Sequence, residues 1–326
     1  MILQLFKNQR PTTLGLLVLI SFALWSFSFA HTDVLSSADG SSLFDWLLHL
    51  IEGIPLIKAL AAVALLIVQA IMINNIIIEN QLISTRTYIP SLIYIVLMSS
   101  TPELLTFYPG LIGNFFFILM LNRLFRTYRD ESSNAKIFDA GLYLGLASTV
   151  HFSFILMLAF GWLTLAILRS FSWRDSIVLM LGTLVPYCFI FTYFYAFDDI
   201  LNLKEHFSFF ADTRVYQEVN LTYNYTPLMF MFTGLLIIAA KTVFLEWRIG
   251  AIKVKKLLST LTIFSAFSLL LPLILSGLDI SFYAALAIPL SIYLSNYFIN
   301  TNKKVAAEVA FLLLLSSIVY LHIVTL

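Results

Sequence analysis

Long apolar runs constrain this chain more than any other feature. A helix needs about 20 apolar residues to cross the hydrocarbon core of a membrane, and runs near that length recur along the chain. Hydrophobic residues make up 60% of the 326 residues, and charged residues only 11%. A water-soluble domain of this size does not need so much apolar surface. The sequence therefore predicts an all-α, polytopic transmembrane helix bundle.

Eleven runs are candidate spans, with 10–12 as the expected range. They cover residues 11–29, 56–78, 87–107, 110–125, 137–150, 152–169, 176–196, 226–246, 257–276, 281–298 and 305–324. No repeat or linker divides them, so residues 1–326 are expected to form a single transmembrane domain. The first run could instead be a signal peptide cleaved after Ser28-Phe29-Ala30, but its 19 residues favour a retained helix.

The stretch 138–168 is too long for one span. Its 31 residues would form a helix of about 46 Å, with cations flanking both ends. Lys and Arg residues collect on the cytoplasmic side of membrane proteins, so two short helices that return to the same side fit better. The chain is therefore expected to form a short helical hairpin around residue 151, with its turn near Thr149-Val150-His151.

The cations also predict the orientation. With eleven spans and the N-terminus inside, fifteen of the 19 Lys and Arg residues fall on the inner side; the exceptions are Lys58, Lys204, Arg214 and Lys241. Eleven of the 18 Asp and Glu residues fall outside. Acidic residues contribute little to insertion, so their excess outside needs another explanation. We expect a multi-pass protein of the bacterial inner (cytoplasmic) membrane, in contact with membrane lipids.

Two sizeable segments, 30–55 and 197–225, are predicted on the outer face. The first contains SLFDWLLHLIEGI, whose apolar residues recur with helical spacing, so an amphipathic helix in the membrane interface is expected. Residues 28–53 also hold four acidic residues and no Lys or Arg. The second segment mixes aromatic residues with acids and cations, which is not typical of disordered chains.

Acidic residues of these segments are candidate catalytic groups. Asp33 lies just past the first run, where a carboxylate could act as a general base or hold Mg²⁺ or Mn²⁺ beside a phosphate. Asp198 and Asp199 follow the seventh run and could form a second acidic site. The alternative for all three is a solvated charge or the polar end of a helix.

Three further residues are candidate contacts for a phosphate or another part of a substrate. His151 lies at the predicted hairpin tip, and Lys204 and Arg214 are cations of the second outer segment. Arg and Lys pair with phosphate oxygens, Arg often through two hydrogen bonds. A hydrogen-bonded turn histidine and ordinary surface charges are the alternatives.

Other patterns restrict the function. Gln69, Asn74 and Asn75 lie in the second run and are expected to hydrogen-bond between helices. Ionisable residues inside the runs are nearly absent, which disfavours an ion-coupled transporter. The single cysteine, Cys188, excludes an intrachain disulfide and a Cys-based metal site. The net charge of +1 gives no indication of nucleic-acid binding.

The stretch FDAGLYLGLASTVHFSFILMLAFGWLTLAILRSFSWRD, followed by LMLGTLVPY, resembles the middle of membrane-embedded GT-C-type glycosyltransferases. In that family a Gly-rich G-x-x-x-G-L-A helix leads into short helices around a cavity for the lipid carrier. An acidic residue just past the first helix, here Asp33, is similar too. The chain as a whole resembles an uncharacterised family of bacterial multi-span integral membrane proteins.

This resemblance implies a polyprenyl-phosphate-dependent transferase, which moves a sugar from the lipid carrier to an acceptor on the outer face. Asp33 would match the catalytic acid of the first loop, and Asp198 and Asp199 a secondary acidic site. Lys204, Arg214 or a bound Mg²⁺ or Mn²⁺ would stabilise the departing phosphate. Two alternatives remain: a non-catalytic membrane subunit or scaffold that binds a membrane protein partner through 197–225, and a lipid or solute carrier.

Overall fold

The computed structural model describes residues 2–26, 44, 55–83, 85–130, 133–169, 172–196, 226–249, 251–274, 280–301 and 304–324. Within these ranges the regular elements are helices and none is a strand, which confirms the all-α prediction. The elements are α1 (Ile2–Leu5), α2 (Pro11–Leu24), α5 (Pro55–Asn80), α6 (Ile89–Met98), η1 (Pro102–Leu104), α7 (Pro109–Phe125), α8 (Asn134–Val150), η2 (Phe152–Leu156), α9 (Met157–Leu168), α10 (Trp173–Ala196), α12 (Thr226–Ile249), α13 (Ile252–Ile274), α14 (Ile280–Ala285), α15 (Ala287–Asn300) and α16 (Lys304–Val324).

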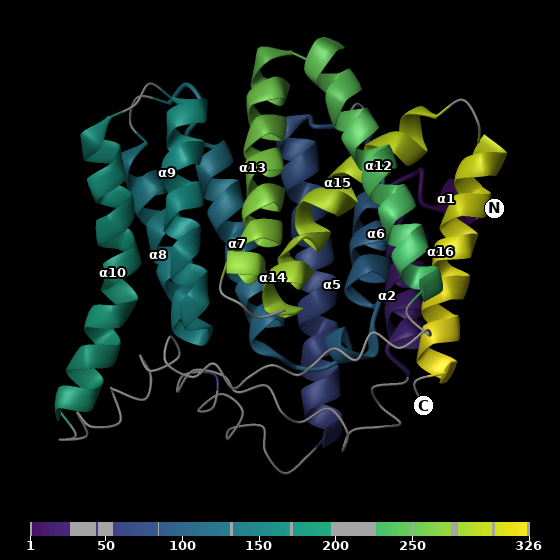
Figure 1. Ribbon diagram of the computed structural model, residues 1–326, viewed down its shortest axis with the longest axis horizontal. Helices are drawn as coiled ribbons and strands as arrows, with labels where there is room; N and C mark the ends of the chain where they lie inside the picture. Colours follow the sequence, from purple (N-terminus) through teal and green to yellow (C-terminus); the bar gives the residue numbers. More distant parts are fainter. Residues whose placement is uncertain are drawn as a thin grey trace.

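Most of these helices stand side by side as a bundle, with α10 at one edge and α16 at the other (Figure 1). Five described helical segments are long and apolar enough to cross a membrane by length and composition: Leu56–Asn80, Trp173–Ala196, Ile252–Pro272, Ser281–Asn300 and Lys304–Val324. Shorter apolar helices lie at Pro11–Leu24, Ile89–Met98, Pro109–Phe125 and Phe152–Leu168. A helical membrane protein is therefore supported, while eleven crossings remain a prediction.

The helix α6 is shorter than the run 87–107 predicted for it. Its 10 residues are all buried, and they extend only about 15 Å, half of a hydrocarbon core of about 30 Å. It contacts α5 on one side and α15 on another, and α15 is itself almost fully buried. Because its neighbours shield α6 from lipid, its length need not match the thickness of the membrane.

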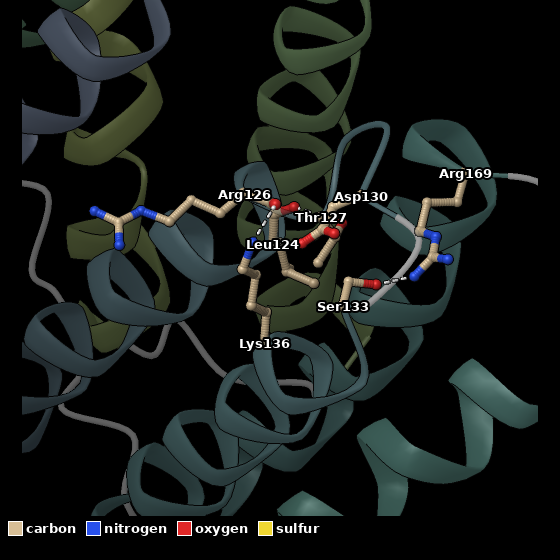
Figure 2. Close-up of polar contacts among 7 residues, drawn as sticks. All are labelled: Leu124, Arg126, Thr127, Asp130, Ser133, Lys136 and Arg169. Carbon is tan, nitrogen blue, oxygen red and sulfur yellow. Dashed lines mark hydrogen bonds and ion pairs between the residues drawn. The ribbon is translucent and has the colours of Figure 1, made fainter.

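α8 and α9 form the predicted hairpin around residue 151. α8 ends at Val150 because the backbone of His151 is extended, with φ −146° and ψ 106°, and η2 then leads into α9. The Arg169 guanidinium contacts the Ser133 hydroxyl, so the residue after α9 meets the residue before α8 (Figure 2). The 17 residues of α8 extend about 26 Å, which is closer to a full crossing than the run 137–150 alone predicts.

Contacts between distant parts of the chain gather the cation-bearing helix ends. An ion pair of 2.8 Å between Arg126 and Glu79 joins the end of α7 to the end of α5. Lys256 at the start of α13 donates to the Leu168 carbonyl at the end of α9, with 3.4 Å between Nζ and the oxygen. Lys136 at the start of α8 reaches the Arg126 carbonyl (Figure 2). We call this end of the bundle the basic end; His151 lies at the opposite end of α8.

Candidate functional site

His151 is the predicted site residue that falls within the described part of the chain. It is 6% exposed. Its imidazole ring packs edge-to-face with the rings of Phe154 and Phe282, whose centroids lie 4.9 and 6.4 Å from the imidazole centroid. The backbone N–H of His151 donates to the Ala147 carbonyl, and its backbone carbonyl accepts from the N–H of Phe154. This burial fits the turn-histidine alternative, and contact with phosphate stays a prediction. The other candidates, Asp33, Asp198, Asp199, Lys204 and Arg214, lie outside the described residues.

Phe44 places part of the first outer segment beside the hairpin tip. It is the residue of 30–54 that the structure describes, and it is 0% exposed. Its side chain belongs to a cluster with Ile112 and Val150, and its ring stacks on Phe107 at 6.1 Å with an interplanar angle of 15°. Val150 directly precedes His151, so Phe44 lies at the His151 end of the bundle. The apolar spacing of SLFDWLLHLIEGI predicts that this side chain is buried, but not which helices cover it.

Two glycines of α7 allow α14 and η2 to pack closely against this helix. A Cβ on Gly110 would come 2.7 Å from the Cα of Ser281, and one on Gly113 would overlap the ring of Phe154. Both positions therefore need a residue without a side chain. As a result, α14 and η2 can pack directly on α7, which brings the Phe282 ring to His151. The sequence gives no signal for the contact between Phe282 and His151, because α14 and the hairpin tip are far apart along the chain.

A buried hydrogen-bond network lies deeper in the bundle. Tyr94 on α6 donates to the Gln69 side-chain oxygen of α5 at 2.7 Å, and the Gln69 amide donates to the Leu111 carbonyl of α7 at 2.7 Å. Asn114 on α7 donates to the Ala284 carbonyl of α14 at 3.1 Å. Its own side-chain oxygen has no hydrogen-bond partner among the described residues. Gln69 thus bonds between helices as predicted. Asn75, for which the same bond was expected, is exposed, and the buried Asn74 side-chain oxygen has no partner among the described residues. Tyr94 and Asn114 were not singled out.

We expect Gln69→Leu to lower the stability of the protein by about 1–2 kcal/mol, because it leaves the Tyr94 hydroxyl and a backbone carbonyl without their partner. Asn75→Leu is the matched control, since Asn75 lies on the exposed side of the same helix. That change is expected to be neutral within about 0.5 kcal/mol. Thermal unfolding in one detergent measures both, and equal effects would contradict an interhelical role for Gln69.

A second polar contact joins the end of α2 to the end of α6, at the end of the bundle opposite the basic end. The buried Trp25 indole donates to the Ser99 hydroxyl at 3.1 Å. A Trp near the end of the first apolar run is a residue that the sequence marks as a candidate for a buried hydrogen bond. Its partner could not be read from the sequence, because Ser99 lies 74 positions away.

The glycines of the G-x-x-x-G-L-A motif pack α8 against α10. A Cβ on Gly141 would overlap the Leu179 carbonyl, and one on Gly145 would lie 2.5 Å from the Thr183 carbonyl. On the α10 side, a Cβ on Gly182 would overlap the Phe138 carbonyl. Small residues let transmembrane helices approach to backbone contact. The Tyr187 hydroxyl adds a 2.8 Å hydrogen bond to Ser148. The motif that carries the glycosyltransferase resemblance thus has a packing role here.

Residues suited to a divalent metal do not come together in the part of the chain that the structure describes. No three His, Cys, Asp or Glu side chains form a group there that could hold an ion. Asp33, the predicted ligand for Mg²⁺ or Mn²⁺, lies outside these residues. The described residues therefore do not supply the predicted site by themselves.

Comparison with known proteins does not identify a family for this chain. No protein-family model matches the sequence, and no curated protein matches it at a significant level. The resemblance to GT-C-type glycosyltransferases rests on the residues quoted above and remains a prediction.

Proposed function

We propose that this chain is an integral membrane transferase that moves a sugar from a polyprenyl-phosphate carrier to an acceptor at the His151 end of the bundle. The packing of Phe44 on Val150 and Ile112 is the observation that supports it most. Asp33 lies 11 residues before Phe44 in the sequence. Because a chain extends at most about 3.6 Å per residue, the 11 residues between them keep Asp33 within about 40 Å of Phe44.

The distribution of charge supports an outward-facing site. Arg126, Lys136, Arg169 and Lys256 make their contacts at the basic end. Because cations collect on the cytoplasmic side, this end is assigned to the inner face, and the opposite end with His151 to the outer face.

The transfer needs a base and a partner for the leaving phosphate. The Asp33 carboxylate takes the proton of the acceptor hydroxyl as its oxygen bonds to the anomeric carbon. The bond from that carbon to the phosphate oxygen breaks, and the polyprenyl phosphate leaves with the electron pair. Lys204 and Arg214 stabilise the charge of the leaving group through charge-assisted hydrogen bonds. No step is assigned to a divalent ion.

Comparing lipid-linked sugars in cells that make or lack the protein tests this function. Cells without it are expected to accumulate one sugar-loaded polyprenyl phosphate and to lose the matching glycan, and restoring the gene should reverse both changes. Identical profiles in the two cell types would contradict a transferase.

The orientation is tested separately by cysteine labelling. The exposed Cys188 is first changed to Ser. In that background, Ser36→Cys is expected to react with an impermeant maleimide in intact cells, whereas Ser132→Cys should react only after the cells are opened. The reverse pattern would place the candidate site on the cytoplasmic side.

A non-catalytic membrane subunit is the second candidate, and α10 offers the surface that a partner helix would contact. This helix buries a single stripe against the bundle and exposes large side chains along the rest, including Phe189 at 73% and Tyr195 at 66%. Such a surface suits lipid or a partner helix. In that case the lipid-linked sugars stay unchanged, and the protein co-purifies with a fixed membrane partner.

A further inference from the structure

We propose that Arg129, which follows α7, and Lys256, near the start of α13, bind the phosphate of an anionic membrane lipid at the basic end. Both cations lie over the ring of Tyr128: the Arg129 guanidinium carbon is 5.5 Å from the ring centroid, and Lys256 Nζ is 5.6 Å from it. The site is separate from the proposed transferase site at the other end of the bundle.

Arg129 and Lys256 have no carboxylate partner among the described residues. Four other cations at this end each form an ion pair with an acid: Arg123 with Asp139, Arg126 with Glu79, Lys136 with Asp130, and Arg169 with Asp175. The contacts of Arg129 and Lys256 are the Tyr128 ring and, for Lys256, the Leu168 carbonyl. Two positive charges near one ring repel each other, and a nearby anion offsets that repulsion.

The start of α13 adds to the positive potential. Lys253, Lys255 and Lys256 all fall in the first five residues of the helix, and no acid lies in its first turn. The N-terminus of a helix is itself positive, so acids rather than lysines are favourable there. Lysines at this position add to the positive potential of the helix terminus.

The backbone of Arg129 is a further indication of a specific role. Its φ is 58°, in the left-handed region that an L-residue with a long side chain rarely adopts. Outliers of this kind concentrate at functional positions. This conformation holds the exposed Arg129 beside the Tyr128 ring.

The place of the site argues for a lipid as the source of the phosphate. Arg129 follows the end of α7, and Lys256 lies in the first turns of α13, so both are at the ends of apolar helices. Phosphate groups of lipids lie at this depth, and basic pockets between transmembrane helices bind them on the cytoplasmic side. Arg can hold two phosphate oxygens through parallel hydrogen bonds.

Lipid titration of the whole protein in detergent, followed by native mass spectrometry, tests this site. The probe is phosphatidylglycerol, with zwitterionic phosphatidylcholine for comparison. Arg129→Gln with Lys256→Gln is expected to weaken the first phosphatidylglycerol adduct at least about tenfold. Arg126→Gln with Lys136→Gln removes the same charge from paired cations, and should leave the affinity within about twofold of the parent protein. Equal weakening in both double variants, or none in either, overturns the proposal.

Two further measurements keep the test decisive. Arg129→Gln alone changes an exposed side chain, so it gives a folded variant if the double change does not, and an affinity equal to that of the parent protein contradicts the proposal. Inorganic phosphate at millimolar concentration is then added to the protein with bound phosphatidylglycerol. A lipid site retains its adduct, whereas displacement would identify a site for free phosphate.

Discussion

Gly141→Leu is expected to separate α10 from α8 and to lower the stability of the protein by more than about 3 kcal/mol. Overpacking a core costs about 1–3 kcal/mol where side chains can move aside. Here the new Cβ would overlap the backbone carbonyl of Leu179, which can move only if the whole helix shifts. α10 buries only a narrow stripe that includes Leu179, Gly182 and Thr183, so few other contacts would hold it.

Gly15→Leu is the matched control for this change. A Cβ at Gly15 meets nothing within 4 Å, and the residue is exposed on its helix. Leucine is also the better helix former, by up to about 1 kcal/mol, so the control should be neutral or slightly stabilising. Size-exclusion chromatography after heating in detergent measures the loss of folded protein. If both variants resist heat equally, close packing at Gly141 is not what holds α10.

The helices could be predicted from the sequence because apolar run length is a local property. The hairpin tip at His151 was also predictable, since the cations on both sides of 138–168 favour a return to the same side. The short α6 was not predictable from run length. Other helices, rather than lipid, surround α6, and the order of the helices along the chain does not predict which of them pack together.

The candidate site was harder to predict from the sequence than the helices. His151 was recognised because an ionisable group near membrane depth is costly. Its partner ring Phe282 lies on α14, more than a hundred positions away in the sequence. Tyr94 and Asn114 were missed for the same reason, because one tyrosine among 15 in this chain carries no mark of its role. Only the fold shows that it bonds to Gln69.

Asp33→Asn is expected to reduce sugar transfer by about 10²- to 10⁴-fold, the usual contribution of a general base. Asparagine has nearly the same size as aspartate but cannot take the acceptor proton. The abundance of the protein should not change, because the substitution removes no apolar surface. Transfer is measured in proteoliposomes from a purified polyprenyl-phosphate sugar, with the amount of inserted protein determined in the same samples.

The controls are Asp39→Asn and Asp45→Asn, which remove the same charge from the same outer segment. If the acids of this segment act only through their summed charge, all three variants lose activity to a similar degree. A general base predicts loss at Asp33 alone, since proton transfer needs one carboxylate within hydrogen-bond reach of the acceptor hydroxyl. Full transfer by Asp33→Asn would rule out this residue as the base. The remaining acids of 30–55 would then be the next to test, since Phe44 of the same stretch packs beside Val150.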